Sequence, residues 1–470
     1  MSGQTSRRSR LSPRWAPGLL ALGLIVFGSV RADDLPLLPP PIPTEKVQDG
    51  SVAKYDLETL RAMALKHNSA ITAARASLAS ALAGRQGVEN IRVPTCLQPD
   101  LPIRRMQAGL GVQAAEAGVR QAELLTVFGV QYAYVSYLFA RDQERIAKEA
   151  VEDKEKEQNL VALSKTIREL FTEDSKVDTD LKKRDALFLE GVLFFARSRL
   201  TEAETGSRRA LSALREAIGV GCDVPLSLKH DRLLDVKGTL DRRQLIDIAL
   251  ANRPDLLAAS INVLVSDLEV KAQGSRNSLN VRTFASGADL HANPLPAGRY
   301  DQEYRPGVSG PEMPPFLSGK KCDRVARASA LASRAAAVSD KARALIILEV
   351  EQAFLRYEEA TAKIGYLNQA AAKLKLAMKG ELDAKGDNKD KNGGLGIEGA
   401  STRLQNSIKA GGESKVALDD VLKFGQVYSQ IRIQANEARY QQLIALITLE
   451  RATGAAFRAD LSGASEVKGE

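Results

Sequence analysis

One segment of the sequence constrains the fold more than any other. Residues 106–171 contain no proline and few glycines, and their apolar residues recur at helical spacing. A continuous α-helix over this segment would be roughly 100 Å long at 1.5 Å per residue. A rod of that length cannot bury its own apolar face in a small globule, so the chain must pack long helices side by side.

The other helical segments are rich in small residues. Alanines crowd residues 114–117 and 326–337, and such runs allow two helices to approach closely. Apolar residues at three- and four-residue spacing form seams suited to antiparallel coiled-coil pairing. Because each seam is only weakly hydrophobic, we expect many helices to pack together and the chain to form an oligomer.

The helical pattern occurs twice along the chain, which predicts two tandem copies at residues 52–222 and 237–457 joined by a connector at 223–236. The offset between matching residues grows from 185 to 220 to 235, so copy two carries insertions before its second and before its last helix. The matches pair Asp56 with Asp241, Leu60 with Leu245, Val130 with Val350, Ala133 with Ala353, Leu214 with Leu449 and Gly219 with Gly454.

The N-terminal segment has the pattern of a secretory signal peptide. Residues 1–32 combine a basic start, an apolar run of about 15 residues and small residues at the expected cleavage position. A membrane-spanning helix needs roughly 20 residues, so we favour a cleaved signal over an anchor. The proline-rich leader at 33–51 is expected to be an extended tether, and residues 458–470 form a tail.

The signal segment also explains the basic character of the chain. The net charge is +8, but the first 32 residues hold five arginines and no acid, which leaves +3 for the remainder. The other basic clusters have no interleaved aromatic residues for base stacking. We therefore expect no nucleic-acid partner.

Residues that carry chemistry are sparse. The three histidines are far apart, no cysteine pair has Cys-x-x-Cys spacing, and no Ser/His/Asp or Cys/His constellation is present. We predict no enzymatic activity, no catalytic residue, no cofactor and no metal. A disulfide between Cys96 and Cys322 is a hypothesis, and the state of Cys222 is left open.

Three segments carry a resemblance to a known family. They are Ala-Leu-Ala-Asn-Arg-Pro-Asp-Leu at 249–256, Pro-Phe-Leu-Ser-Gly at 315–319 and Leu-Glu-Arg-Ala-Thr-Gly at 449–454. With the two-copy order, they resemble the TolC family of outer-membrane efflux and secretion channels. The resemblance implies a mainly α fold, a homotrimer with a long helical tunnel of coiled-coil hairpins, and an outer-membrane β-barrel. It also implies a periplasmic adaptor on the helical tip and an inner-membrane pump.

The resemblance further places Asp420, and Asp185 at the matching position, at an aperture in the periplasmic tip. A threefold ring of carboxylates at a constriction is an electrostatic filter that favours cations. The family's second acid, one turn later, is Lys423 here. The alternative is that both aspartates only begin a helix. Val416 and Leu418 are candidate adaptor contacts, or else buried seam positions.

The barrel is where the chain departs from the family. A spanning strand needs about 9–11 alternating residues, and in copy one residues 84–104 are too few for two strands and contain Pro94, Pro99 and Pro102. Copy two has a candidate hairpin at 275–320, where only 279–284 alternates, and a glycine-rich insertion expected to be a flexible loop at 381–412. The barrel contribution is therefore expected to be small or divergent.

Two functions follow from the sequence. The first is a passive conduit in the outer membrane, belonging to a tripartite efflux or type I secretion system. The second is a periplasmic coiled-coil scaffold of the same descent that lacks a membrane-spanning barrel.

Overall fold

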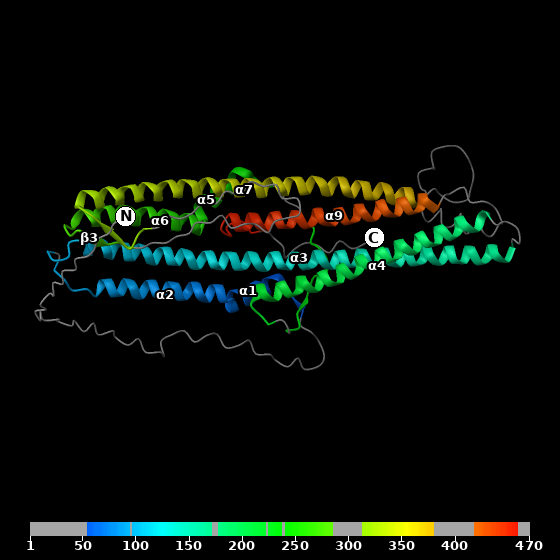
Figure 1. Cartoon of the computed structure of the whole chain (residues 1–470), viewed down its shortest axis with the longest axis horizontal. Helices are drawn as coiled ribbons and strands as arrows, with labels where there is room; N and C mark the ends of the chain where they lie inside the picture. Colours follow the sequence, from blue (N-terminus) through cyan, green and yellow to red (C-terminus); the bar gives the residue numbers. More distant parts are fainter. Residues whose placement is uncertain are drawn as a thin grey trace, which may run out of the picture. The chain divides into compact units, whose positions relative to one another are not determined.

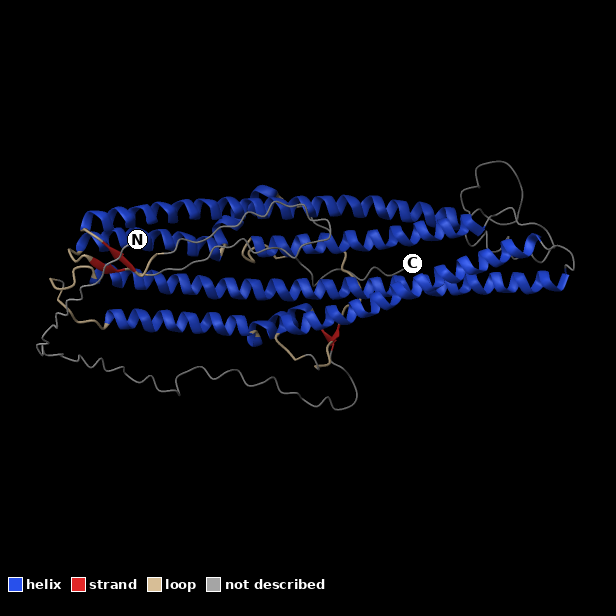
Figure 2. Cartoon of the chain, viewed as in Figure 1, coloured by secondary structure: helices blue, strands red, loops and turns tan. Residues whose placement is uncertain are grey.

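The computed structural model describes residues 54–94, 96–171, 177–221, 224–236, 240–284, 313–379 and 418–458. All of them belong to one compact unit, Lys46–Glu470. The predicted signal peptide, the leader, the 381–412 insertion and residues 459–470 lie outside these ranges. Helices dominate the described residues, and four short strands accompany them (Figure 2).

The helices repeat in the predicted order. Each copy has a short helix, a helix of about twenty residues and then two long helices, and the predicted continuous helix is confirmed as α3. In copy one these are α1 (Leu57–His67), α2 (Ser69–Glu89), α3 (Leu101–Phe171) and α4 (Val177–Ile218). In copy two they are α5 (Arg242–Asn252), α6 (Pro254–Ser275), α7 (Lys321–Lys379) and α9 (Leu418–Ala452).

The long helices pack as antiparallel pairs. Within each copy α3 packs along α4 and α7 along α9, while α2 and α6 cover the first part of α3 and α7 (Figure 1). The two copies meet along α3, which contacts both α6 and α9. The mainly α fold of two tandem helical repeats is therefore confirmed.

Matched residues begin and break the first helices of each copy. Asp56 caps α1 by accepting a hydrogen bond from the backbone N–H of Thr59 at 2.8 Å, and Asp241 caps α5 by accepting from Arg243 at 2.9 Å. In each copy the short first helix ends just before the second begins, with Asn68 between α1 and α2 and Arg253 between α5 and α6. These breaks turn the chain so that both helices of each copy can lie against its long helices.

The break between α5 and α6 bears on whether a helix of this chain could span a membrane. The axes of α5 and α6 differ by 48°. In the part of the chain that the structure describes, no single helix has the length and apolar character of a membrane span, and α5 and α6 meet that test only as a bent pair.

A glycine at the end of each copy lies against the break between the first two helices of that copy. Gly219 and Gly454 follow α4 and α9 with φ of 83° and 66°, a left-handed conformation that disfavours side chains. A Cβ at Gly219 would lie 3.1 Å from the carbonyl oxygen of His67, and one at Gly454 would lie 2.7 Å from that of Asn252. The last helix of each copy therefore ends in backbone contact with the break between its first two helices.

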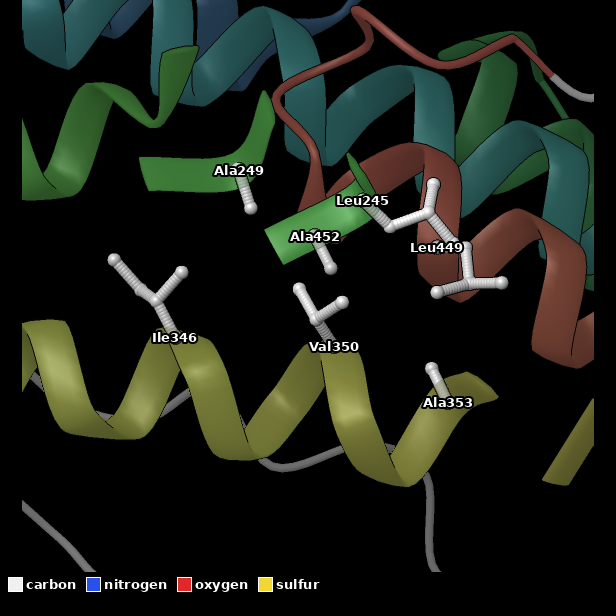
Figure 3. Close-up of a cluster of buried hydrophobic side chains, with 7 residues drawn as sticks. All are labelled: Leu245, Ala249, Ile346, Val350, Ala353, Leu449 and Ala452. Atoms are coloured by element: carbon white, nitrogen blue, oxygen red, sulfur yellow. The ribbon is translucent and has the colours of Figure 1, made fainter. Parts of the chain in front are cut away.

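Beside each contact lies a small apolar core. In copy two it joins α5, α7 and α9 through Leu245, Ala249, Ile346, Val350, Ala353, Leu449 and Ala452 (Figure 3). Most of the matching residues of copy one are also buried, among them Leu60, Ala64, Val130, Ala133 and Leu214. The two copies thus share one packing arrangement as well as one helix order.

The strands lie at the ends of connections. The parallel pair β1 (Lys54–Tyr55) and β2 (Ser227–Leu228) ties the start of copy one to the connector between copies. The antiparallel pair β3 (Asn280–Arg282) and β4 (Phe316–Ser318) lies between α6 and α7. In copy one, the described residues of the loop between α2 and α3, 90–94 and 96–100, form no strand.

We predict that Gly454→Ala destabilises the protein by about 2 kcal/mol, because the new Cβ is strained at positive φ and collides with a backbone oxygen. Thermal unfolding followed by circular dichroism measures the effect. Gly129→Ala, in α3 where a Cβ would meet nothing within 4 Å, is the matched control and should be neutral or slightly stabilising. Equal melting temperatures for the two variants would contradict the proposed contact.

Candidate functional site

The predicted aperture residues lie near the end of the molecule where α3 is followed by α4 and α7 by α9. We call this end of the long helices the hairpin ends. Asp420 is in the first turn of α9 and Leu418 is its first residue, whereas Asp185 lies about two turns inside α4. Helix capping therefore remains an explanation for Asp420 but does not apply to Asp185. The side chains of these three residues lie outside the described part of the chain, as does the whole of Val416.

Polar contacts between α3 and α9 join the two copies. The first centres on Glu450, whose carboxylate accepts a hydrogen bond from the Gln131 amide at 2.8 Å and lies 3.5 Å from the guanidinium of Arg61. Glu450 is buried, so its charge depends on these partners. The contact ties α9 to both α1 and α3 of the other copy.

The second contact centres on Tyr440. Its hydroxyl donates to that of Tyr132 at 3.3 Å and lies 3.1 Å from the hydroxyl of Ser136. Its ring stacks on Phe139 with centroids 4.5 Å apart, and burial raises the pKa of the phenol well above its ordinary value. Tyr440 therefore remains neutral and serves as an apolar anchor with a satisfied polar tip.

The third contact lies further toward the hairpin ends. A guanidinium nitrogen of Arg432 lies 2.6 Å from a carboxylate oxygen of Glu149. Both side chains are about one-third exposed, so water and salt screen this pair more than the Glu450 contact. The attachment of α9 to α3 thus becomes weaker and more salt-sensitive toward the predicted aperture.

A buried ion cluster stabilises the break in copy two. Arg253 lies 2.6 Å from Asp255 and 2.9 Å from Glu349, and Glu349 also pairs with Arg451. The Arg451 guanidinium lies over the ring of Phe128 in α3, 4.6 Å from its centroid. The cluster therefore joins α6, α7 and α9 to the other copy.

A second buried cluster lies near β3. The Glu269 carboxylate is fully buried and accepts hydrogen bonds from Arg104, from Gln107 at 3.0 Å and from Gln273 at 2.7 Å. Burial raises the pKa of Glu269, but the hydrogen bonds and charge of Arg104 outweigh burial and hold that pKa below its ordinary value. Glu269 is therefore ionised at neutral pH.

The same cluster positions the strands. Arg324, fully buried at the start of α7, donates to the side chain of Gln273 at 3.0 Å and to the carbonyl oxygen of Gly319 at 3.0 Å. Arg104 donates to the carbonyl oxygen of Arg282 in β3 at 2.7 Å. The β3–β4 pair is thus fastened to α3, α6 and α7.

Sequence reasoning did not single out Glu269 or Arg324. A signal was present, because Glu269 lies at a position that helical periodicity from Val265 and Ala272 assigns to the buried face. A charge at such a position requires a partner of opposite charge. The sequence did not show which of the chain's 66 basic residues supplies it.

The disulfide hypothesis is wrong for this structure. Cys96 and Cys322 are both free and exposed, since the first lies in the loop before α3 and the second on the outer side of the first turn of α7. Cys222 lies outside the described residues. Histidine 230, expected to be isolated, has its Nδ1 2.9 Å from the hydroxyl of the buried Tyr134.

The described residues offer little for chemistry. Among them, no group of three or more His, Cys, Asp or Glu side chains is placed to hold a metal ion. An open hollow of about 320 Å³ lies between α6 and α7 and is lined by Arg253, Asp340 and Arg343. The buried charges of the described residues hold the helices in place relative to one another.

Several solved structures with this arrangement are described as outer-membrane channels. The channel OprN matches with a TM-score of 0.62 and 15% identity over 85% of this chain and 90% of that one. The chain has a TolC-like fold. CusC matches with a TM-score of 0.59 and 15% identity over 86% and 95% of the two chains. The open state of the Neisseria gonorrhoeae channel MtrE matches with a TM-score of 0.55 and 16% identity over 85% and 88%.

The comparisons that match the chain are those with solved structures. No protein-family model matches the sequence, and no curated protein matches it either.

We predict that Glu269→Gln lowers the free energy of unfolding by about 3 kcal/mol at pH 7, because it leaves the mostly buried Arg104 without its main counter-charge. Urea unfolding measures the loss. Glu123→Gln is the control, since Glu123 forms only an exposed pair with Arg75 at 3.4 Å and should change stability by less than about 1 kcal/mol.

The stabilisation by Glu269 should also depend on pH. The pKa of Glu269 is lower in the folded than in the unfolded protein, so its stabilisation is complete above the ordinary value of 4.5 and is lost as the pH falls toward the folded pKa. Glu269→Gln should therefore lose less stability than the parent between about pH 5 and pH 3. Parallel pH profiles would show that Glu269 does not titrate on unfolding.

Proposed function

We propose that the protein is the outer-membrane channel component of a tripartite efflux or type I secretion system. It acts as a passive homotrimeric conduit from periplasm to exterior after export by the signal peptide at 1–32. The TolC-like fold carries this proposal, because it extends over 85% of the chain and is shared with structures described as outer-membrane channels.

The surface of the single chain supports assembly. Large apolar side chains are exposed on three of the long helices. They are Phe194 and Phe195 on α4, Leu355 and Tyr366 on α7, and Val427 and Ile433 on α9. A monomer in water would leave this area uncovered. A threefold tunnel would bury it between neighbouring copies.

The aperture and the adaptor site belong to the same proposal. Asp420 and Asp185, repeated by threefold symmetry, would form rings of carboxylates at the periplasmic entrance and favour cations. Val416 and Leu418 would meet a periplasmic adaptor, which links the conduit to an inner-membrane pump. In this arrangement the conduit has no chemistry of its own.

A second function is favoured by one observation. Among the described residues, the loop between α2 and α3 forms no strand, and the connection between α6 and α7 has one antiparallel strand pair. This observation favours one hairpin for each chain. Three chains would then supply six strands, fewer than the eight of the smallest outer-membrane barrels. A periplasmic scaffold of the same descent that does not cross the bilayer fits this count.

Cell fractionation separates the two functions. We expect the protein in the outer membrane, as a trimer that stays together in detergent and conducts ions in planar bilayers. Recovery as a soluble periplasmic product without conductance would reject the channel and favour the scaffold.

We predict that Asp420→Ala raises the single-channel conductance and weakens the preference for cations, because it removes a ring of negative charge from the entrance. Asp267→Ala, at an exposed position of α6 far from the hairpin ends, is the control and should leave the conductance unchanged. Unaltered conductance in Asp420→Ala would leave Asp420 with a capping role only.

A further inference from the structure

One end of the helical unit exposes an unusual set of apolar side chains. They come from the loop between α2 and α3 and from the region of β3 and β4. Leu97 is 72% exposed, Leu279 70%, Phe316 51% and Val93 38%. We call these four side chains and the basic residues around them the strand-end surface.

The two parts of this surface are held together. A guanidinium nitrogen of Arg276, before β3, lies 3.3 Å from a carboxylate oxygen of Asp100, at the end of the loop. On the loop side, Arg105 donates to the carbonyl oxygen of Ile91 at 2.9 Å. On the strand side, the Gly319 N–H donates to the carbonyl oxygen of Leu279 at 2.8 Å. Figure 1 shows β3 beside the start of α3.

The strand pair has two different faces. Val281 and Leu317 lie opposite each other and are buried toward the helices. The next pair, Arg282 and Phe316, is exposed on the outer face. A cation beside an aromatic ring, on the side away from the core, is the residue pair that suits a boundary between lipid headgroups and acyl chains.

The exposed charges around the apolar residues are mainly positive. The acids Asp100 and Glu269 are buried and paired with arginines, so they do not offset this charge. Over residues 89–105, 276–284 and 313–323, the exposed acids are Glu89 and Asp323 alone among described residues. The exposed bases are Arg92, Arg105, Arg282, Lys320 and Lys321.

We propose that the strand-end surface binds the surface of a bilayer that contains anionic phospholipid. Leu97, Leu279 and Phe316 enter the boundary of the acyl chains, and the surrounding Arg and Lys side chains contact the headgroup phosphates. The described residues of the loop between α2 and α3 form no strand. In copy one this loop thus rests on the leaflet. This inference goes beyond the proposed channel, because it requires no pore and applies equally to a scaffold.

The charge pattern favours lipid over a second copy of the chain as the occupant. If this surface packed against the same surface of a second molecule, its five exposed bases would face five like charges. Anionic headgroups neutralise those bases while the acyl boundary accepts the apolar side chains. The two requirements are met by one partner.

The natural cysteine beside Leu97 provides the probe. In the full chain carrying Cys222→Ser and Cys322→Ser, Cys96 is labelled with an environment-sensitive fluorophore and mixed with vesicles of phosphatidylglycerol and phosphatidylethanolamine. We expect a blue shift and quenching by lipids brominated near the headgroup. A label at Ser198→Cys, exposed on α4, should respond to neither.

Substitutions then test which side chains bind. Leu97→Gln with Phe316→Gln should weaken vesicle binding at least tenfold, and Arg92→Glu with Arg282→Glu should remove the preference for phosphatidylglycerol over phosphatidylcholine. Leu257→Gln with Leu264→Gln, two exposed leucines of α6 outside the surface, is the control and should stay within twofold of the parent. Circular dichroism confirms that each variant is folded.

Two results would overturn the proposal. One is equal vesicle binding by the surface variants and the control. The other is a blue shift that follows protein concentration without quenching by brominated lipid, which assigns the surface to a second copy. The test of the channel is separate. If the protein does not conduct ions but brominated lipid still quenches the label, the proposed channel is rejected and the proposed lipid-binding surface stands.

Discussion

The constraint on which the structure depends is the need to cover one 71-residue helix along its whole length. Helix α3 meets α1, α2 and α4 of its own copy and α6 and α9 of the other, so each part of it has a different neighbour. Small side chains let these neighbours approach closely, and each seam buries little apolar area. Stability is therefore spread over many weak contacts, and a few buried ion clusters determine the register between helices.

The sequence was sufficient for the repeat because local and tertiary signals agree there. Asp56 and Asp241 begin helices, Gly219 and Gly454 end them, and the residues between recur at helical spacing. The matched residues Leu245 and Leu449 lie in the core of copy two, since a duplicated helix order buries equivalent positions. The long α3 helix followed from the absence of proline, the few glycines and the helical spacing of the apolar residues.

What could not be predicted depends on which distant residues meet. Glu269 and Arg104 are 165 positions apart, and charged residues on a helix are usually solvated. The free state of Cys96 and Cys322 likewise depends on the directions of two side chains, which spacing does not give. Of the predicted aperture, only helix positions are described, so Asp185 and Asp420 keep the status of a proposal.

The loop between α2 and α3 has a consequence for symmetry. Along the long helices the two copies are similar, since each has one antiparallel pair, α3 with α4 and α7 with α9. The proposed trimer would therefore hold six similar helix pairs. At the strand end the copies differ, because one has a tied loop and the other a strand pair, and three chains would present three units of each kind. A single polypeptide would then combine quasi-sixfold packing along its helices with strictly threefold symmetry at the strand end.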